Sequence, residues 1–207
     1  MIKLKNLIYE SIEGSVFISV DIQPEYAGAF GFSIYEFTSF LNENFEKFDK
    51  LIFLYNGADT VDGVNLYDYQ AWLIENGLNP DIVEQSKFYD KGYAFFRFCI
   101  DNYIDETAIV NFVTFLYKNQ INDSREMTRE MWAKYLKLHR RQDKLEVYQL
   151  LKHSDDFINI PDLMDFLRIF RTKTVITGGG INECLKEVEI ALKALGTQYS
   201  IYQKFTY

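Results

Sequence analysis

The sequence predicts an α/β protein with a three-layer Rossmann-like fold, a mainly parallel sheet and an inserted helical segment. Short apolar runs rich in β-branched residues alternate with amphipathic segments of helical period, both before residue 90 and after residue 160. The joints between these segments are short, which is typical of right-handed strand–helix–strand crossovers. The runs are apolar throughout and do not alternate with polar residues, which indicates strands buried on both faces of a parallel sheet.

The first part of the chain predicts two consecutive strand–helix–strand units. In order, these are a strand at 16–20, a helix at 33–48, a strand at 51–55, a helix at 65–77 and a third strand within 81–90 that ends near Lys87. Ser33 is a suitable N-cap for the first helix, and Gly77 is a suitable stop for the second.

The closing part repeats the pattern. It predicts a helix at 161–170 that begins with Pro161, a strand at 174–177, a glycine turn, a helix at 183–195 and a terminal strand at 199–207. Residues 105–157 between the two parts are almost wholly helical in pattern. We therefore expect one domain over 1–207, with a helical insertion at about 97–160.

Charge and composition restrict the class of protein. The net charge is −8, which disfavours a broad electrostatic contact with nucleic-acid backbones. No apolar run is as long as the roughly 18 residues of a membrane helix, so no membrane association is expected. The two cysteines, Cys99 and Cys184, have no metal-ligand spacing and fit free thiols in the cytoplasm.

One segment, the basic helix 125–144, departs from the acidic average, with seven basic and three acidic residues. This pattern is typical of the solvated face of an amphipathic helix. It also fits a docking surface for a protein or nucleic-acid partner.

Polar residues that could carry chemistry follow the predicted strands. Because ligands of open parallel sheets bind outside the carboxyl ends of the strands, these ends supply the candidates. They are Asp21 and Gln23 after the first strand, Asn56, Asp59 and Asp62 after the second, Lys87, Asp90 and Lys91 at the third, and residues 178–184 at the fourth.

Cys184 opens the last predicted helix. With Asn182 as the N-cap it is the second helical residue, where free N–H groups and the helix dipole favour a thiolate. Gly178, Gly179 and Gly180 allow a ligand to approach the backbone and present N–H groups to an oxyanion. The alternative for Cys184 is a small thiol packed under the sheet.

Three short motifs resemble those of the isochorismatase-like cysteine hydrolases. "VDIQ" contains Asp21, "DKGYAFF" contains Lys91, with Lys87 as its rival, and "GGGINECL" contains Cys184. The resemblance implies that Asp21 is a general base, that the lysine stabilises charge, and that Cys184 attacks a carbonyl or imine carbon of a small-molecule substrate. Gln23 and the three glycines would bind the substrate. It also implies a homo-oligomer, and no metal cofactor is expected.

Two other classes stay open. The strand–helix order with acidic strand ends is similar to the NYN/PIN-like metal-dependent nucleases, in which carboxylates hold Mg or Mn. The corresponding candidates are Asp21, Asp59, Asp90 or Asp123, and Glu183. In this class the basic helix 125–144 would hold nucleic acid. The third class is a non-catalytic binding protein on the same fold.

Overall fold

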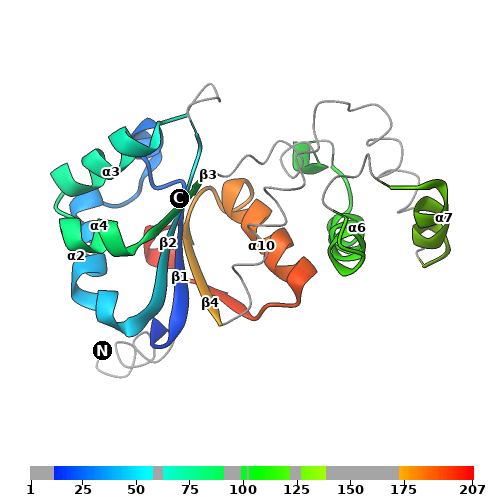
Figure 1. The fold of residues 1–207 in the computed structure, drawn as a ribbon. Helices are drawn as coiled ribbons and strands as arrows, with labels where there is room; N and C mark the ends of the chain where they lie inside the picture. Colours follow the sequence, from blue (N-terminus) through cyan, green and yellow to red (C-terminus); the bar gives the residue numbers. More distant parts are fainter. Residues whose placement is uncertain (1–11, 58–62, 91–98, 102, 122–126, 139–172) are drawn as a thin grey trace. The chain divides into compact units, whose positions relative to one another are not determined.

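The computed structural model describes residues 12–57, 63–90, 99–101, 103–121, 127–138 and 173–207 (Figure 1). The chain divides into two compact units. The first consists of Met1–Lys91, Thr172–Leu185 and Gln198–Tyr207 and contains the sheet, and the second consists of Gly92–Arg171 and Lys186–Thr197. The predicted insertion at about 97–160 therefore falls within the second unit.

A five-stranded, all-parallel sheet forms the centre of the first unit, which confirms the predicted α/β fold. Its strand order is β3-β2-β1-β4-β5. The strands are β1 (Ser15–Val20), β2 (Phe48–Tyr55), β3 (Lys87–Asp90), β4 (Thr174–Gly178) and β5 (Tyr199–Ile201). Strand β1 therefore lies between β2 and β4.

All six residues of β1 are buried. Phe17 faces one layer of the protein, where its ring stacks on Phe48 at 4.7 Å between centroids. Ile18, the next residue along, points to the opposite face and is also fully buried. A strand that is covered on both faces needs apolar side chains in both directions, which explains its continuous apolar run.

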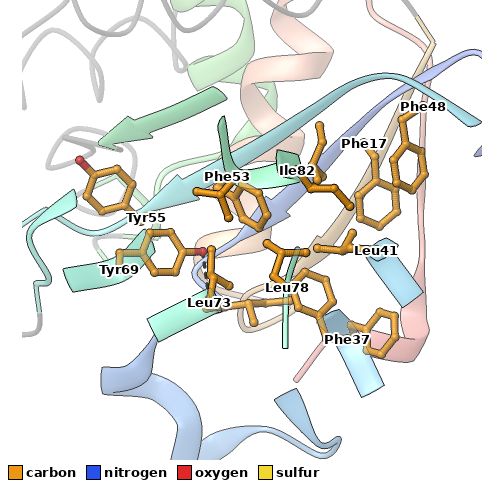
Figure 2. Close-up of a cluster of buried hydrophobic side chains, with 14 of the residues drawn as sticks. Phe17, Phe37, Leu41, Phe48, Phe53, Tyr55, Tyr69, Leu73, Leu78 and Ile82 are labelled. Atoms are coloured by element: carbon orange, nitrogen blue, oxygen red, sulfur yellow. Dashed lines mark hydrogen bonds between the residues drawn. The ribbon is translucent and has the colours of Figure 1, made fainter. Parts of the chain in front are cut away.

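Three helices pack on the Phe17 face of the sheet. They are α2 (Ile34–Asn44), α3 (Leu66–Glu75) and α4 (Pro80–Gln85). Figure 2 shows how Phe37 of α2, Leu73 of α3 and Ile82 of α4 meet the aromatic side chains of the strands in one apolar cluster. The helices begin at polar caps: Ser33 caps α2 as predicted, and the Asn65 side chain accepts a hydrogen bond from the Asp68 N–H at 2.9 Å.

Two predicted boundaries in this unit were wrong. The helix predicted at 33–48 ends at Asn44, a 3-10 turn (η2, Phe45–Lys47) follows, and Phe48 already begins β2. The third strand begins at Lys87 and does not end there, because α4 precedes it. The Asn79 side chain accepts from the Asp81 N–H at 3.0 Å and Pro80 takes the first helical position, which favours a helix start over an extended chain.

The predicted terminal strand at 199–207 was also too long. Only Tyr199–Ile201 pairs with β4, and a 3-10 turn (η4, Gln203–Phe205) follows. Phe205 is fully buried, with its ring 5.2 Å from those of both Phe32 and Phe37. Burial of this aromatic ring turns the chain back over the sheet and ends the strand pairing.

The described part of the second unit is helical. It contains α6 (Glu106–Lys118), α7 (Arg129–Leu138) and most of α10 (Cys184–Leu195). The Phe112 and Tyr135 rings of α6 and α7 pack edge to face at 5.3 Å. The helix predicted at 161–170 lies outside the described residues. Where the structure describes the chain, none of the helices combines the length and the apolar character that a membrane span requires.

The basic helix 125–144 is described over α7. Arg129, Lys134 and Lys137 are all exposed on it, and the Lys134 ammonium donates to the Asn119 side chain at 3.0 Å. Tyr135, on another side of the helix, is buried. These residues form the solvated face of an amphipathic helix, and a protein or nucleic-acid partner at this face stays a prediction.

In the second unit Glu106 of α6 forms ion pairs with Lys186 and Lys193 of α10. Burial by itself would raise the pKa of Glu106, but the hydrogen bonds and positive charges of the two lysines lower it overall. A carboxylate whose pKa is lowered by folding stabilises the protein above its unfolded-state pKa, and this stabilisation is lost as pH falls through the folded-state value.

We therefore predict that Glu106→Gln lowers the free energy of unfolding at pH 7 by about 0.5–1 kcal/mol, a modest effect because all three side chains are partly exposed. The difference from the parent protein should shrink toward zero below about pH 4, where the parent carboxylate becomes protonated as well. Urea denaturation at pH 7 and at pH 3.5 measures both values. An equal difference at the two pH values would contradict the ion-pair explanation.

Candidate active site

The carboxyl ends of β1 and β4 meet at the point where the strand order reverses. Val20 lies in register with Leu54 of β2 on one side and with Gly178 of β4 on the other. The chain leaves β1 for β2, whereas β4 is added later on the opposite edge of β1. In open parallel sheets this switch point is where ligands bind. Asp21 and the turn at 178–180 therefore lie at the expected position of a site.

Asp21 is fully buried and adopts an uncommon backbone conformation. Its φ is +50°, in the left-handed region that a non-glycine residue seldom occupies. Two hydrogen bonds hold the residue: its N–H donates to the Leu54 carbonyl at 2.8 Å, and its own carbonyl accepts from the Tyr207 hydroxyl at 2.9 Å. The backbone of Asp21 is thus fixed on both sides.

The turn after β4 requires glycine at two positions. Gly178 and Gly179 have φ values of +83° and +57°. A Cβ on Gly178 would lie 2.1 Å from the Val20 carbonyl oxygen, and one on Gly179 would lie 3.3 Å from the Cβ of Cys184. These glycines therefore bring the end of β4 against β1 and carry the chain closely past Cys184.

Cys184 is the first residue of α10, one position earlier in the helix than an Asn182 cap predicts. The Gly180 carbonyl accepts from the Glu183 N–H at 2.9 Å and from the Leu185 N–H at 3.2 Å, so that a turn occupies the intervening residues and delays the helix. The thiol is half-buried. Cys184 still lies in the first helical turn, where the N–H groups have no acceptor within the helix and where the positive end of the helix dipole lies.

Tyr207 connects the two strand ends, and sequence reasoning did not identify it. Its hydroxyl bonds to Asp21, its N–H donates to the Gly179 carbonyl at 3.3 Å, and its ring lies 5.1 Å from that of Phe30. Burial raises the pKa of Tyr207, and the negative charges of Asp21 and Cys184 raise it further, followed by Tyr26 and Glu183. The phenol thus lies within electrostatic reach of both proposed catalytic residues.

Gln23 was predicted to bind the substrate, but its side-chain amide contacts other parts of the protein. Gln23 is fully buried, its Oε1 accepts from the Asn56 N–H at 2.8 Å, and its Nε2 donates to the Glu25 carboxylate at 3.1 Å. The Asn56 amide in turn donates to the Tyr26 hydroxyl at 3.0 Å. The geometry favours a role for Gln23 in joining the segments that follow β1 and β2.

The two candidate lysines differ in position. Lys87 is the first residue of β3 and pairs in register with Ile52, so it lies at the amino end of the strand, away from the candidate site. Lys91 follows directly after the last residue of β3, Asp90, but lies outside the described residues. The strand direction therefore argues against Lys87 as the lysine of the candidate site, and the role of Lys91 stays a prediction.

The carboxylates of the nuclease alternative are only partly described. Asp21 is buried and Glu183 is exposed, whereas Asp59 and Asp123 lie outside the described residues, as does the strand-end candidate Asp62. Asp90 accepts a hydrogen bond from the Gly57 N–H at 3.1 Å. In the part of the chain that the structure describes, no three histidine, cysteine or acidic side chains gather as metal ligands.

No protein-family model matches the chain, and neither the curated proteins nor the solved structures contain a significant match to it.

We predict that Gly178→Ala destabilises the protein by at least about 3 kcal/mol, because a clash with the Val20 carbonyl adds to the strain of a positive φ. Gly14→Ala is the matched control: Gly14 also has a positive φ, of +64°, but nothing lies within 4 Å of its added Cβ. Its cost should be about 1 kcal/mol. Urea denaturation measures both, and equal costs would show that close approach to β1 does not determine the choice of glycine at 178.

The two cysteines should differ in reactivity. Cys99 is 1% exposed, and burial raises its pKa to about 12, whereas Cys184 is half-buried. At pH 8.5 fewer than about one in a thousand Cys99 thiols is ionised. We expect iodoacetamide to label Cys184 alone in the native protein, and peptide mass spectrometry identifies the site. Labelling of Cys99 at a comparable rate would contradict its burial.

Proposed function

We propose that the protein is a hydrolase of isochorismatase-like type, which acts on a small molecule through the Cys184 thiolate with Asp21 as the general base. The observation that carries this proposal is the placement of the two residues. They follow adjacent strands at the switch point of the sheet, and both influence the same phenol, that of Tyr207. A nucleophile and an acceptor for its proton at a ligand-binding edge are the two groups that covalent hydrolysis requires.

The proposed reaction has two stages. In the first, the thiol proton moves to Asp21, the sulfur bonds to the substrate carbonyl carbon, and the leaving group departs with the proton. In the second, water attacks the resulting thioester while Asp21 accepts its proton. The acid is released, and the proton returns to the sulfur. In this proposal the N–H groups of the glycine turn would donate to the oxyanion of each stage.

Lys91 completes the proposal on the grounds of the sequence motif and of its place after β3. We assign it the stabilisation of developing negative charge, the role that the resemblance implies.

A metal-dependent nuclease is the second proposal. Two carboxylates, Asp21 and Glu183, contribute to the electrostatic environment of Tyr207 at the same edge of the sheet. Two carboxylates are fewer than such a site usually employs, and the remaining candidates lie outside the described residues. The described geometry therefore supports the cysteine reaction better.

The central test uses p-nitrophenyl acetate, an activated ester that reports acylation without knowledge of the natural substrate. We expect one equivalent of p-nitrophenolate to be released in a burst, with an acetyl group on Cys184 by mass spectrometry. Cys184→Ser should abolish the burst and Asp21→Asn should slow it about 100-fold or more, as loss of a general base does. Cys99→Ser is the matched control and should retain the burst.

Substitution of Asp21 should make the Cys184 thiol easier to ionise, although the same substitution slows acylation. In this proposal Asp21→Asn removes a negative charge beside the thiolate, so the pH midpoint of Cys184 labelling should fall while acylation slows. A burst that survives in Cys184→Ser would overturn the cysteine mechanism. The nuclease proposal would then be favoured if Mg²⁺- or Mn²⁺-dependent cleavage of a labelled single-stranded oligonucleotide were lost in Asp21→Asn and retained in Cys184→Ser.

A further inference from the structure

Tyr207 reaches the switch point because the segment before it is firmly attached to the sheet. The Tyr202 N–H donates to the Ile176 carbonyl at 2.9 Å, and the Tyr202 carbonyl accepts from the Thr177 hydroxyl at 2.7 Å. Phe205 is then fully buried in the aromatic cluster. These contacts fix the direction in which the chain leaves β5, and they deliver Tyr207 to the ends of β1 and β4.

The hydroxyl of Tyr207 bonds to Asp21, whose backbone conformation is unfavourable for a residue that carries a side chain. A positive φ at an ordinary side chain costs about 1–2 kcal/mol and persists only where neighbouring groups enforce it. At Asp21 the N–H is bound by the Leu54 carbonyl, and the carbonyl is bound by Tyr207. Of these two bonds, only the second comes from a side chain, so a single substitution can remove it without breaking the ladder of the sheet.

The phenol keeps its proton under physiological conditions. Its pKa is raised by burial first and by the nearby negative charges next, so the hydroxyl is a neutral, permanent donor. Its donation to the Asp21 carbonyl therefore does not switch with pH.

We propose that Tyr207 is a positioning residue of the candidate active site: it holds the backbone of Asp21 in its left-handed conformation and thereby aims the carboxylate toward the reacting groups. The effect of Tyr207 on catalysis rests on the proposed function. Its hydrogen bond to the Asp21 backbone is a property of the fold and does not depend on that function.

The test compares Tyr207→Phe with Tyr35→Phe, which makes the same chemical change on a side chain that is 67% exposed. With p-nitrophenyl acetate, the acylation rate constant of Tyr207→Phe should fall about tenfold at an unchanged half-saturating concentration, because a misdirected base lowers the rate without altering ground-state binding. Tyr35→Phe should match the parent.

A second measurement tests the anchoring without catalysis. In Tyr207→Phe the Asp21 amide, which donates to Leu54, should exchange its hydrogen with solvent about tenfold faster by NMR, because local opening becomes easier. The Ile18 amide in the middle of β1 is the internal control and should not change. Parent-like amide exchange and a parent-like acylation rate constant in Tyr207→Phe would overturn the positioning role. An intact burst in Cys184→Ser would instead overturn the proposed function, and faster exchange at Asp21 would still support the anchoring.

Discussion

Strand β1 pairs in parallel with β2 on one edge and β4 on the other, and the arrangement of the candidate site depends on this double pairing. The backbone of β1 is satisfied on both sides and its side chains are buried on both faces, so no charged residue is tolerated between Ser15 and Val20. The first carboxylate, Asp21, appears directly where the pairing ends. Because β2 lies on one edge of β1 and the much later strand β4 lies on the other, polar groups of segments that are distant in the sequence gather there.

The same edge combines a rigid support with locally unfavourable conformations. The aromatic cluster on the Phe17 face and the buried Phe205 hold the helices and the terminal turn in place. Against this support, Asp21, Gly178 and Gly179 have positive φ values, and at Asp21 the surrounding hydrogen bonds stabilise this uncommon conformation. Conformational strain that is confined to a binding edge and surrounded by a close-packed core is the usual condition of a preorganised site.

The strands and most helices were predictable because their signals are local. Apolar runs mark β1, β2 and β4, and strand-end reasoning placed Asp21 and Cys184 at one edge. The helix α4 was missed because a six-residue segment is too short for hydrophobic periodicity to distinguish a helix from a strand. For such a short segment, the capping residue before it is the signal that indicates a helix. The role of Gln23 and the position of Tyr207 depend on partners 33 and 186 residues away, and no pattern in one sequence contains such contacts.

The hydrogen bonds that follow β2 also affect the chemical stability of the protein. Asn56 precedes Gly57, and an asparagine before glycine is the pairing most prone to spontaneous deamidation, because the glycine nitrogen can attack the side-chain carbonyl. Here the Gly57 N–H is held by the Asp90 carboxylate, and the Asn56 amide is held by Tyr26. The attack would require both groups to leave their partners. The chain contains two Asn-Gly pairs, at 56–57 and at 76–77. The hydrogen bonds described here protect the first of them from deamidation for as long as the protein stays folded.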